Sequence, residues 1–453
     1  MLRTLGFRGG IHPPSDKVPT AQSAIEELPP PSRVIIPVLQ HAGSAASLLV
    51  RRGDRVRLGQ VIAEPAGHNS AAVHSSVSGT VLSVSKFPHP NGERVLAAEI
   101  ENDGQDSSVD MRPLEKPWSE AAPAEIVQKI RECGIVGMGG EGIPAHVKLS
   151  LSAGKPIGMF IVNCTECEPL MTADARLVME KCGDVLTGAL IVKKVLGAGK
   201  AAVAADAGAP GVLAALSQTL KDARFKGISL SPTKTKYPQS EEKILVKTLT
   251  RRVVPSGGTP ADVGCMVHNA ATVYAVAQAV LAGVPLYRRV ITVAGPCIAS
   301  PKNLFVRIGT PLKHVLEHCG VDMKAAKKII MGGPMRGLAQ AELDTPVIKT
   351  TRGIIALSEL FPGVKQYDCI GCGRCMRACP MRLLPAFLMK FVDKGKTAEA
   401  VKWGIGACIE CGSCAYVCPA KINLVHFMKL GKYRAGQSGA PQAPASAANG
   451  KAS

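Results

Sequence analysis

The sequence of 453 residues is poor in aromatic and acidic side chains, and it lacks long apolar runs. Aromatic residues make up 4% of the chain, which leaves few rings on which bases could stack, so we do not expect nucleic-acid binding. No segment reaches the roughly 18 uninterrupted apolar residues of a transmembrane helix, and the first residues contain no signal-peptide core. The sequence therefore predicts a protein that is neither secreted nor membrane-spanning.

Positive charge is in excess, with 54 basic and 35 acidic residues and a formal net charge of +19. Such an excess indicates an anionic partner, such as an acidic protein or an anionic membrane surface. Scattered, solvated lysines are the alternative. The length corresponds to about three domains, which is enough to bury several cores.

Eight of the fifteen cysteines lie in two runs near the carboxyl end. Each run reads C-x2-C-x2-C-x3-C-P, the spacing of two-cluster bacterial ferredoxins, in which the fourth cysteine ligates the other cluster. Zinc sites use two ligand pairs separated by a longer gap, so zinc fits this pattern poorly. We expect two [4Fe–4S] clusters. The expected ligand sets are Cys369, Cys372, Cys375 with Cys418, and Cys408, Cys411, Cys414 with Cys379.

The cysteine-rich segment is itself basic. Residues 366–434 contain 11 basic and 4 acidic residues, a net charge of +7. Two such clusters with their thiolates carry roughly −2 each when oxidised, so the segment stays basic when it is loaded. This charge favours docking to an acidic redox partner or to an anionic membrane surface.

A glycine-rich loop precedes a second candidate site. Its glycines are Gly137, Gly139, Gly140 and Gly142, and Lys148 follows in a short predicted helix. Glycines let backbone N–H groups approach a phosphate, and a lysine can pair with a phosphate or flavin oxygen. A plain turn explains the loop about as well.

Polar residues follow the next predicted strand, which covers residues 157–162. Asn163 stands at its carboxyl end, where open α/β sheets bind ligands, and Glu166 and Glu168 follow at once. The two carboxylates beside a glycine loop can hydrogen-bond a ribose or a nicotinamide, or they can cap a turn. Alternating strands and helices continue to about residue 221, which indicates an α/β unit.

Several motifs occur in a fixed order along almost the whole chain. They are FRGGIHPPSDK, the glycine loop, NCTECEP, KYPQSEEK, VPSGGTPADVGC, IMGGPMRG and the two cysteine runs. Together they resemble the RnfC family, the C subunits of the Rnf (Rsx) ion-translocating electron-transport complexes, over residues 5–430. The central part is similar to the NADH- and FMN-binding subunit of respiratory complex I. This resemblance implies a Rossmann-like domain that binds FMN and NADH through the glycine loop, Lys148, Asn163, Glu166 and Glu168.

Two further segments resemble known modules. Residues 33–100 are similar to barrel-sandwich domains of the biotinyl/lipoyl type, although the hairpin has no carrier lysine. Residues 286–340 resemble the β-grasp (SLBB-like) module that follows the flavin domain in the family. We expect a multidomain α/β protein. Its parts are a barrel-sandwich segment (1–110), a Rossmann-like FMN/NADH domain (120–285), an SLBB-like β-grasp module (286–345), an α-helical two-cluster ferredoxin domain (360–432) and a disordered tail (433–453).

The resemblance implies a peripheral subunit on the cytoplasmic side of a cell membrane. It would act as part of a complex that is an oxidoreductase and a translocase, passing electrons between NADH, FMN, the two clusters and the membrane subunits. Two alternatives remain open at this stage. One is a soluble flavin and iron–sulfur reductase similar to cobalamin reductases. The other is a scaffold that carries electrons but performs no chemistry on NADH.

Overall fold

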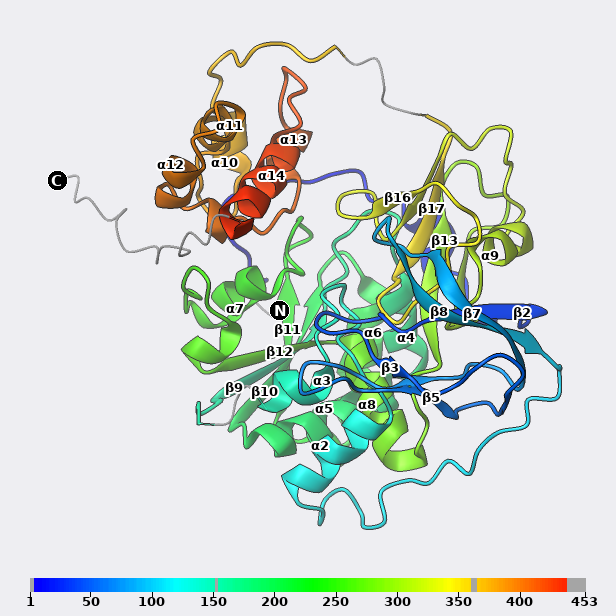
Figure 1. Ribbon diagram of the computed structural model, residues 1–453. Coiled ribbons are helices and arrows are strands. Elements are labelled where there is room, and N and C mark those ends of the chain that lie inside the picture. Colours follow the sequence, from blue (N-terminus) through cyan, green and yellow to red (C-terminus); the bar gives the residue numbers. More distant parts are fainter. Residues whose placement is uncertain (1–3, 151–153, 360–364, 438–453) are drawn as a thin grey trace.

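The computed structural model describes residues 4–150, 154–359 and 365–437. Within these ranges the chain forms four units, each with its own buried apolar cluster. In Figure 1 the helical unit of the carboxyl end, in orange and red, lies beside the green parallel sheet. No helix in the described ranges combines the length and the apolar character that crossing a membrane requires.

The first unit is a sandwich of short antiparallel strands. One sheet has the order β2-β8-β7-β4 and the other has the order β3-β5-β6. Val34 and Ile36 of β2 and Ala98 and Ile100 of β8 point into one core, as the two-residue period of a strand requires. The strands are β2 (Arg33–Pro37), β3 (Ser47–Leu48), β4 (Arg55–Val56), β5 (Val61–Glu64), β6 (Val73–His74), β7 (Gly79–Pro88) and β8 (Arg94–Asn102).

The second unit is a four-stranded parallel sheet with the order β11-β10-β9-β12. Phe160 and Val162 of β9 face one apolar cluster, and Ile161 between them faces another with Leu245 and Val246 of α7. Both faces are therefore covered, which explains the nearly continuous apolar strands. The strands are β9 (Met159–Cys164), β10 (Lys200–Asp206), β11 (Ile228–Thr233) and β12 (Cys265–Asn269). The helices are α2 (Pro123–Glu132), α3 (Ala145–Ser150), α4 (Ala173–Glu180), α5 (Cys182–Leu196), α6 (Pro210–Thr219), α7 (Glu242–Thr250) and α8 (Ala270–Ala282).

The third unit is a mixed six-stranded sheet with the order β1-β14-β13-β17-β15-β16, and helix α9 contributes to its core. Its elements are β1 (Ile25–Glu27), β13 (Arg288–Ala294), β14 (Lys302–Arg307), α9 (Leu312–His318), β15 (Lys328–Met331), β16 (Leu338–Gln340) and β17 (Gly353–Leu357). The sheet thus extends beyond the expected limits of 286–345, because β1 pairs with β14 and β17 lies between β13 and β15. Both pairings join segments that are distant in sequence.

The fourth unit, over the described residues 365–437, consists of short helices joined by loops that carry the cysteines, as expected for the cysteine-rich segment. Leu388 and Val392 of α11 pack against Leu424 and Met428 of α14. The helices are α10 (Arg374–Ala378), α11 (Pro385–Asp393), α12 (Thr397–Lys402), α13 (Ser413–Tyr416) and α14 (Leu424–Gln437). Residues 433–437 of the expected disordered tail are therefore helical, and the rest of that tail, 438–453, lies outside the described residues.

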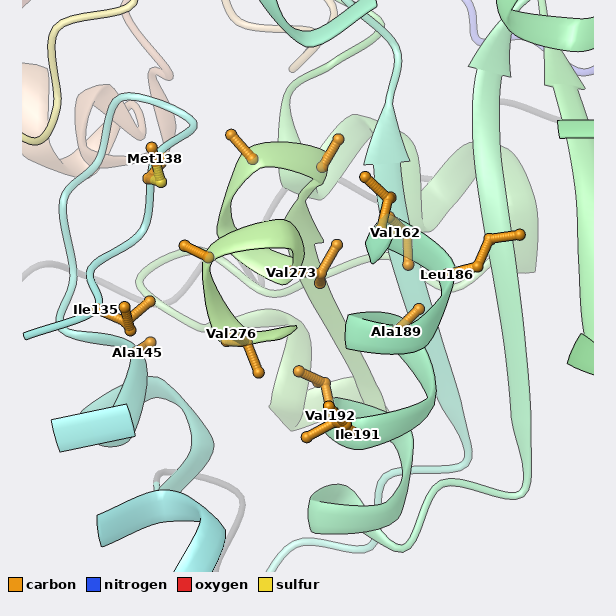
Figure 2. Close-up of a cluster of buried hydrophobic side chains, with 14 of the residues drawn as sticks. Ile135, Met138, Ala145, Val162, Leu186, Ala189, Ile191, Val192, Val273 and Val276 are labelled. Atoms are coloured by element: carbon orange, nitrogen blue, oxygen red, sulfur yellow. The ribbon is translucent and has the colours of Figure 1, made fainter. Parts of the chain in front are cut away.

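Helices α5 and α8 cover one face of the parallel sheet and touch each other. Figure 2 shows Val273 and Val276 of α8 beside Ala189 and Val192 of α5. A Cβ atom built at Gly188 of α5 would lie 1.9 Å from the carbonyl oxygen of Val273. Only glycine lets the two helices approach this closely.

Replacing Gly188 by alanine is expected to lower the free energy of unfolding by about 1–3 kcal/mol, because the methyl group forces α5 and α8 apart. Gly183→Ala in the same helix is the matched control, since a Cβ there meets nothing within 4 Å. That control should leave stability unchanged or slightly higher. Denaturant unfolding followed by circular dichroism measures both, and equal stabilities of the two variants would contradict this packing.

Candidate functional site

A cavity of about 400 Å³ opens where the parallel sheet meets the loops of the mixed sheet. Asn163, at the end of β9, and His268 and Asn269, at the end of β12, line it. The carboxyl ends of parallel strands meet at one edge of a sheet, so residues distant in sequence converge there. The loop containing Gly332 and Gly333 approaches from the mixed sheet. The cavity therefore belongs to both units.

The glycine loop forms one wall of this cavity. Gly137, Gly139 and Gly140 line it, as the sequence predicts. The N–H of Gly137 donates to the carbonyl of Ile143 over 2.8 Å, which closes the loop. Gly140 has a φ of +114°, a backbone conformation that favours glycine. Gly142 does not line the cavity, and a Cβ atom there would lie 2.8 Å from Cγ2 of Thr350.

Lys148 and Asn163 both line the cavity, and each is held by a partner from residues 240–242. The ammonium of Lys148 pairs with the carboxylate of Glu242, and burial raises the pKa of Glu242. Nδ2 of Asn163 donates to the carbonyl of Ser240 over 2.7 Å. The two predicted residues are therefore fixed against the same short segment.

Glu168 joins the two units at the cavity. Its Oε1 accepts hydrogen bonds from the backbone N–H groups of Met335 (2.8 Å) and Arg336 (3.1 Å). A Cβ atom at Gly333 would lie 1.9 Å from Cγ of Glu168, so this loop packs directly on the carboxylate. Burial raises the pKa of Glu168, while Arg352 and the two N–H groups oppose that shift.

Glu166, in contrast, lies outside the residues that line the cavity. Its carboxylate accepts hydrogen bonds from the N–H groups of Asp174 (3.3 Å) and Ala175 (3.1 Å) at the start of α4. Nη2 of Arg352 lies 3.6 Å from Glu166 and 3.3 Å from Asp174. The structure thus gives Glu166 the capping role that the sequence left as an alternative.

Other lining residues were not singled out as site residues from the sequence. Arg336 and Arg352 line the cavity, and Arg336 pairs with Glu241 over 2.9 Å. The motif IMGGPMRG contains Arg336 and offered a signal, whereas nothing in the sequence marked Arg352. His268 is buried, lines the cavity, and its Nε2 has no hydrogen-bond partner among the described residues.

Lys349 is buried directly beside the lining residues Ile348 and Thr350. Its ammonium donates to the carbonyls of Ala72 and Gly134, each over 2.7 Å. Burial lowers its pKa to about 7. One side chain thus ties the barrel-sandwich unit to the start of the glycine loop.

The cysteine runs interleave as the sequence predicts. One cavity of about 250 Å³ is lined by Cys369, Cys372, Cys375 and Cys418, and a smaller one by Cys379, Cys408, Cys411 and Cys414. Each set takes three thiols from one run and one from the other, a donor set that fits a four-iron cluster. Across residues 4–150, 154–359 and 365–437, no three His, Cys, Asp or Glu side chains meet closely enough to hold a single metal ion.

The two cysteine sets differ in exposure. Cys369 and Cys372 are exposed, whereas Cys411 and Cys414 are buried. The hydroxyl of Tyr237, a residue that lines the large cavity, donates to the carbonyl of Cys411 over 2.7 Å. The set containing Cys411 therefore faces the large cavity, and the other set faces solvent.

Comparison with protein families divides the chain in the same way. Residues 5–105 match the RnfC barrel sandwich hybrid domain, residues 130–278 match the Nuo51 FMN-binding domain, and residues 368–422 match the 4Fe-4S dicluster domain. The barrel-sandwich, flavin-domain and dicluster predictions are confirmed. A crystal structure of an NAD+-reducing [NiFe]-hydrogenase shares the fold over 72% of this chain and 63% of its own, with a TM-score of 0.50 at 16% identity.

Two curated relatives match over nearly the whole length. The chain is 43% identical to the C subunit of the proton-translocating ferredoxin:NAD(+) oxidoreductase complex of Clostridium ljungdahlii, over 87% of this chain and 86% of the relative. It is 38% identical to the C subunit of the Na(+)-translocating ferredoxin:NAD(+) oxidoreductase complex of Acetobacterium woodii, over 86% and 87%. By this extent of identity and this order of domains, the chain belongs to the RnfC family, the C subunits of ion-translocating ferredoxin:NAD(+) oxidoreductase complexes.

Proposed function

We propose that this chain passes electrons between NADH and the other subunits of an ion-translocating membrane complex, through FMN in the large cavity and two [4Fe–4S] clusters. The observation that carries this proposal is the direct hydrogen bond between Tyr237, which lines the cavity, and Cys411. It brings a nucleotide-sized cavity and a cluster-type cysteine set into contact through one side chain. The family to which the chain belongs performs electron transfer coupled to ion movement.

The cavity offers the groups that a flavin mononucleotide needs. Gly137, Gly139 and Gly140 present a wall without side chains, along which a phosphate or ring can approach the backbone. Lys148 and Arg336 supply positive charge for the phosphate. FMN, when bound, supplies chemistry that exchanges electrons in pairs or singly. Asn163 and Glu168 shape the edge of the site, while Gly142 and Glu166 support it from outside.

The two cysteine sets hold the clusters, with Cys379, Cys408, Cys411 and Cys414 nearer the cavity and Cys369, Cys372, Cys375 and Cys418 nearer solvent. Such clusters supply one-electron steps. Tyr367 and Ile370 beside the exposed set are 57% and 70% exposed. We infer that an acidic redox partner docks on this rim, because the segment around it carries a net charge of +7.

We also propose the domain boundaries of the chain and its position at the membrane. We assign the barrel-sandwich segment to 1–110, the FMN/NADH domain to 120–285 and the ferredoxin domain to 360–432. The SLBB-like β-grasp assignment for 286–345 is extended to Leu357 and includes β1, because these strands share one sheet. We also propose that the chain is a peripheral subunit on the cytoplasmic side of the membrane, because its net charge of +19 favours contact with anionic lipid headgroups.

Anaerobic titration with NADH tests the function directly. The purified chain, loaded with FMN and clusters, should lose its flavin absorbance and then show the electron paramagnetic resonance of reduced clusters. NADH would give two electrons and a proton, and each of the two clusters would take one electron. If NADH leaves flavin and clusters oxidised while dithionite reduces both, NADH is not the donor.

Cys372→Ala should lower the iron content from about eight to about four atoms per chain, because one cluster loses a ligand. FMN binding should persist, since Cys372 is not among the residues that line the large cavity. Cys297→Ala is the control, because this buried cysteine belongs to neither set. Iron and sulfide analysis measures the cluster content of both variants. Equal iron contents would show that Cys372 is not a cluster ligand.

Lys148→Met should weaken FMN binding by about tenfold or more, the effect of one lost charge-assisted contact. Riboflavin, which lacks the phosphate, should bind as before if Lys148 faces the phosphate. Flavin fluorescence titrations measure both affinities.

Two controls accompany this variant. Lys155→Met breaks the ion pair of Lys155 with Asp262 (2.6 Å), which lies outside the cavity, and should not alter FMN binding. Lys148→Met combined with Glu242→Gln avoids leaving a buried carboxylate unpaired and should reproduce the loss. Equal losses for FMN and riboflavin would place Lys148 away from the phosphate.

A further inference from the structure

The segment Leu5–Ile11, which we call the strap, passes between the parallel-sheet unit and the helical unit. Figure 1 shows this dark-blue stretch running from the parallel sheet past the helices of the carboxyl end. It contains the motif FRGG, whose residues line neither the large cavity nor the cavities of the cysteine sets. The contacts of the strap indicate a structural role.

The two ends of the strap pair with the end of β11 and with the segment that follows it. The N–H of Leu5 donates to the carbonyl of Pro232 over 3.0 Å, and the N–H of Lys234 donates to the carbonyl of Leu5 over 2.7 Å. Ile11 and Tyr237 exchange two backbone hydrogen bonds, of 2.9 and 3.0 Å. The strap is therefore fixed to the unit that carries the large cavity.

The middle of the strap contacts the helical unit. The N–H of Gly10 donates to the carbonyl of Ala378 over 2.8 Å. Gly9 has a φ of +86°, and a Cβ atom there would lie 2.8 Å from the carbonyl oxygen of Cys379 and 3.2 Å from Cα of Pro380. The backbone of a cluster-type cysteine thus rests directly on Gly9, and no side chain fits between them.

The same contact area contains a direct connection from the large cavity to a cysteine set. Ile11, Tyr237, Ala378 and Cys411 form one buried cluster, with Met335 packed against it. Tyr237 reaches the carbonyl of Cys411, and a Cβ atom at Gly412 would lie 3.3 Å from the carbonyl oxygen of Met335. A shift of the helical unit on the strap would change this spacing.

We propose that the strap is a positioning element that sets the spacing between the large cavity and the set of Cys379, Cys408, Cys411 and Cys414, and thereby the rate at which electrons cross between them. This inference rests on the proposed function. It assigns no chemistry to the strap itself, because Gly9 and Gly10 offer only backbone and a close approach. Its effect is confined to one step, the passage from flavin to cluster.

The test compares Gly9→Ala with Gly53→Ala in the full chain loaded with FMN and clusters. Gly53 has a similar φ of +92°, but a Cβ atom there meets nothing within 4 Å, so it controls for backbone strain alone. In Gly9→Ala, cluster reduction should slow by about tenfold or more, because small displacements of reacting groups carry large rate penalties. Bleaching of the flavin by NADH, iron content and the cluster spectra should match those of Gly53→Ala.

A second measurement does not depend on activity. Hydrogen exchange at the amides of Gly10, Ile11 and Tyr237 should quicken in Gly9→Ala and stay unchanged in Gly53→Ala, because these amides hold the strap in place. Tyr237→Phe provides a variant that needs no backbone change, since it removes only the hydroxyl that reaches Cys411. It should also slow cluster reduction relative to the unaltered protein, if the spacing that Tyr237 maintains limits this step.

The outcomes separate the strap from the proposed function. Cluster reduction at the same rate in Gly9→Ala and Gly53→Ala overturns the role of the strap. If NADH fails to bleach the flavin of the unaltered protein, the proposed donor is wrong. The electrons are then supplied by photoreducing the flavin with EDTA, and the same comparison of cluster-reduction rates decides the role of the strap.

Discussion

The carboxylate of Glu168 is the contact on which the large cavity depends. It comes from the loop after β9, yet it accepts the N–H groups of Met335 and Arg336 from the mixed sheet. A buried carboxylate without partners carries a large desolvation cost. Burial raises the pKa of Glu168, and these hydrogen bonds and the nearby charge of Arg352 oppose that rise. The cavity lies between the two units that this side chain joins.

Charge is distributed unevenly between the inside and the outside of the molecule. The large cavity is lined by Glu168, Glu241 and Glu242, each with a raised pKa because burial penalises the charged form. The helical unit carries a net charge of +7 over residues 366–434. Buried acids paired with Lys148 and Arg336 create fixed local dipoles, whereas exposed lysines and arginines create a long-range field that falls off with salt. Paired buried charges suit the binding of one small ligand, whereas exposed positive charges suit the approach of a large partner.

The sequence predicted most of what depends on local spacing. The spacing of the two cysteine runs predicted both interleaved cysteine sets. The apolar run before Asn163 predicted the strand whose end lines the cavity. The sequence could not predict that Arg352 lines the cavity or that β17 lies between β13 and β15. Both features depend on pairings between segments far apart in the chain. The sequence offered capping as an alternative for both Glu166 and Glu168 but could not separate them, because the two acids are alike until the N–H groups at the start of α4 bind Glu166.

The helical unit has its own apolar core, and its contact with the rest of the described chain is a small buried cluster around Ile11, Tyr237 and Cys411. A contact of that size would be weak between separate molecules, but here both sides belong to one chain. Covalent connection gives the two sides a high effective concentration, so a few hydrogen bonds and one close glycine contact suffice to hold them in register. Contacts within a chain that resemble transient interfaces also permit relative motion. In our proposal, the strap limits relative motion of the two units at the contact between the large cavity and the Cys411 set. The other cysteine set, which includes the exposed Cys369 and Cys372, is not held by the strap.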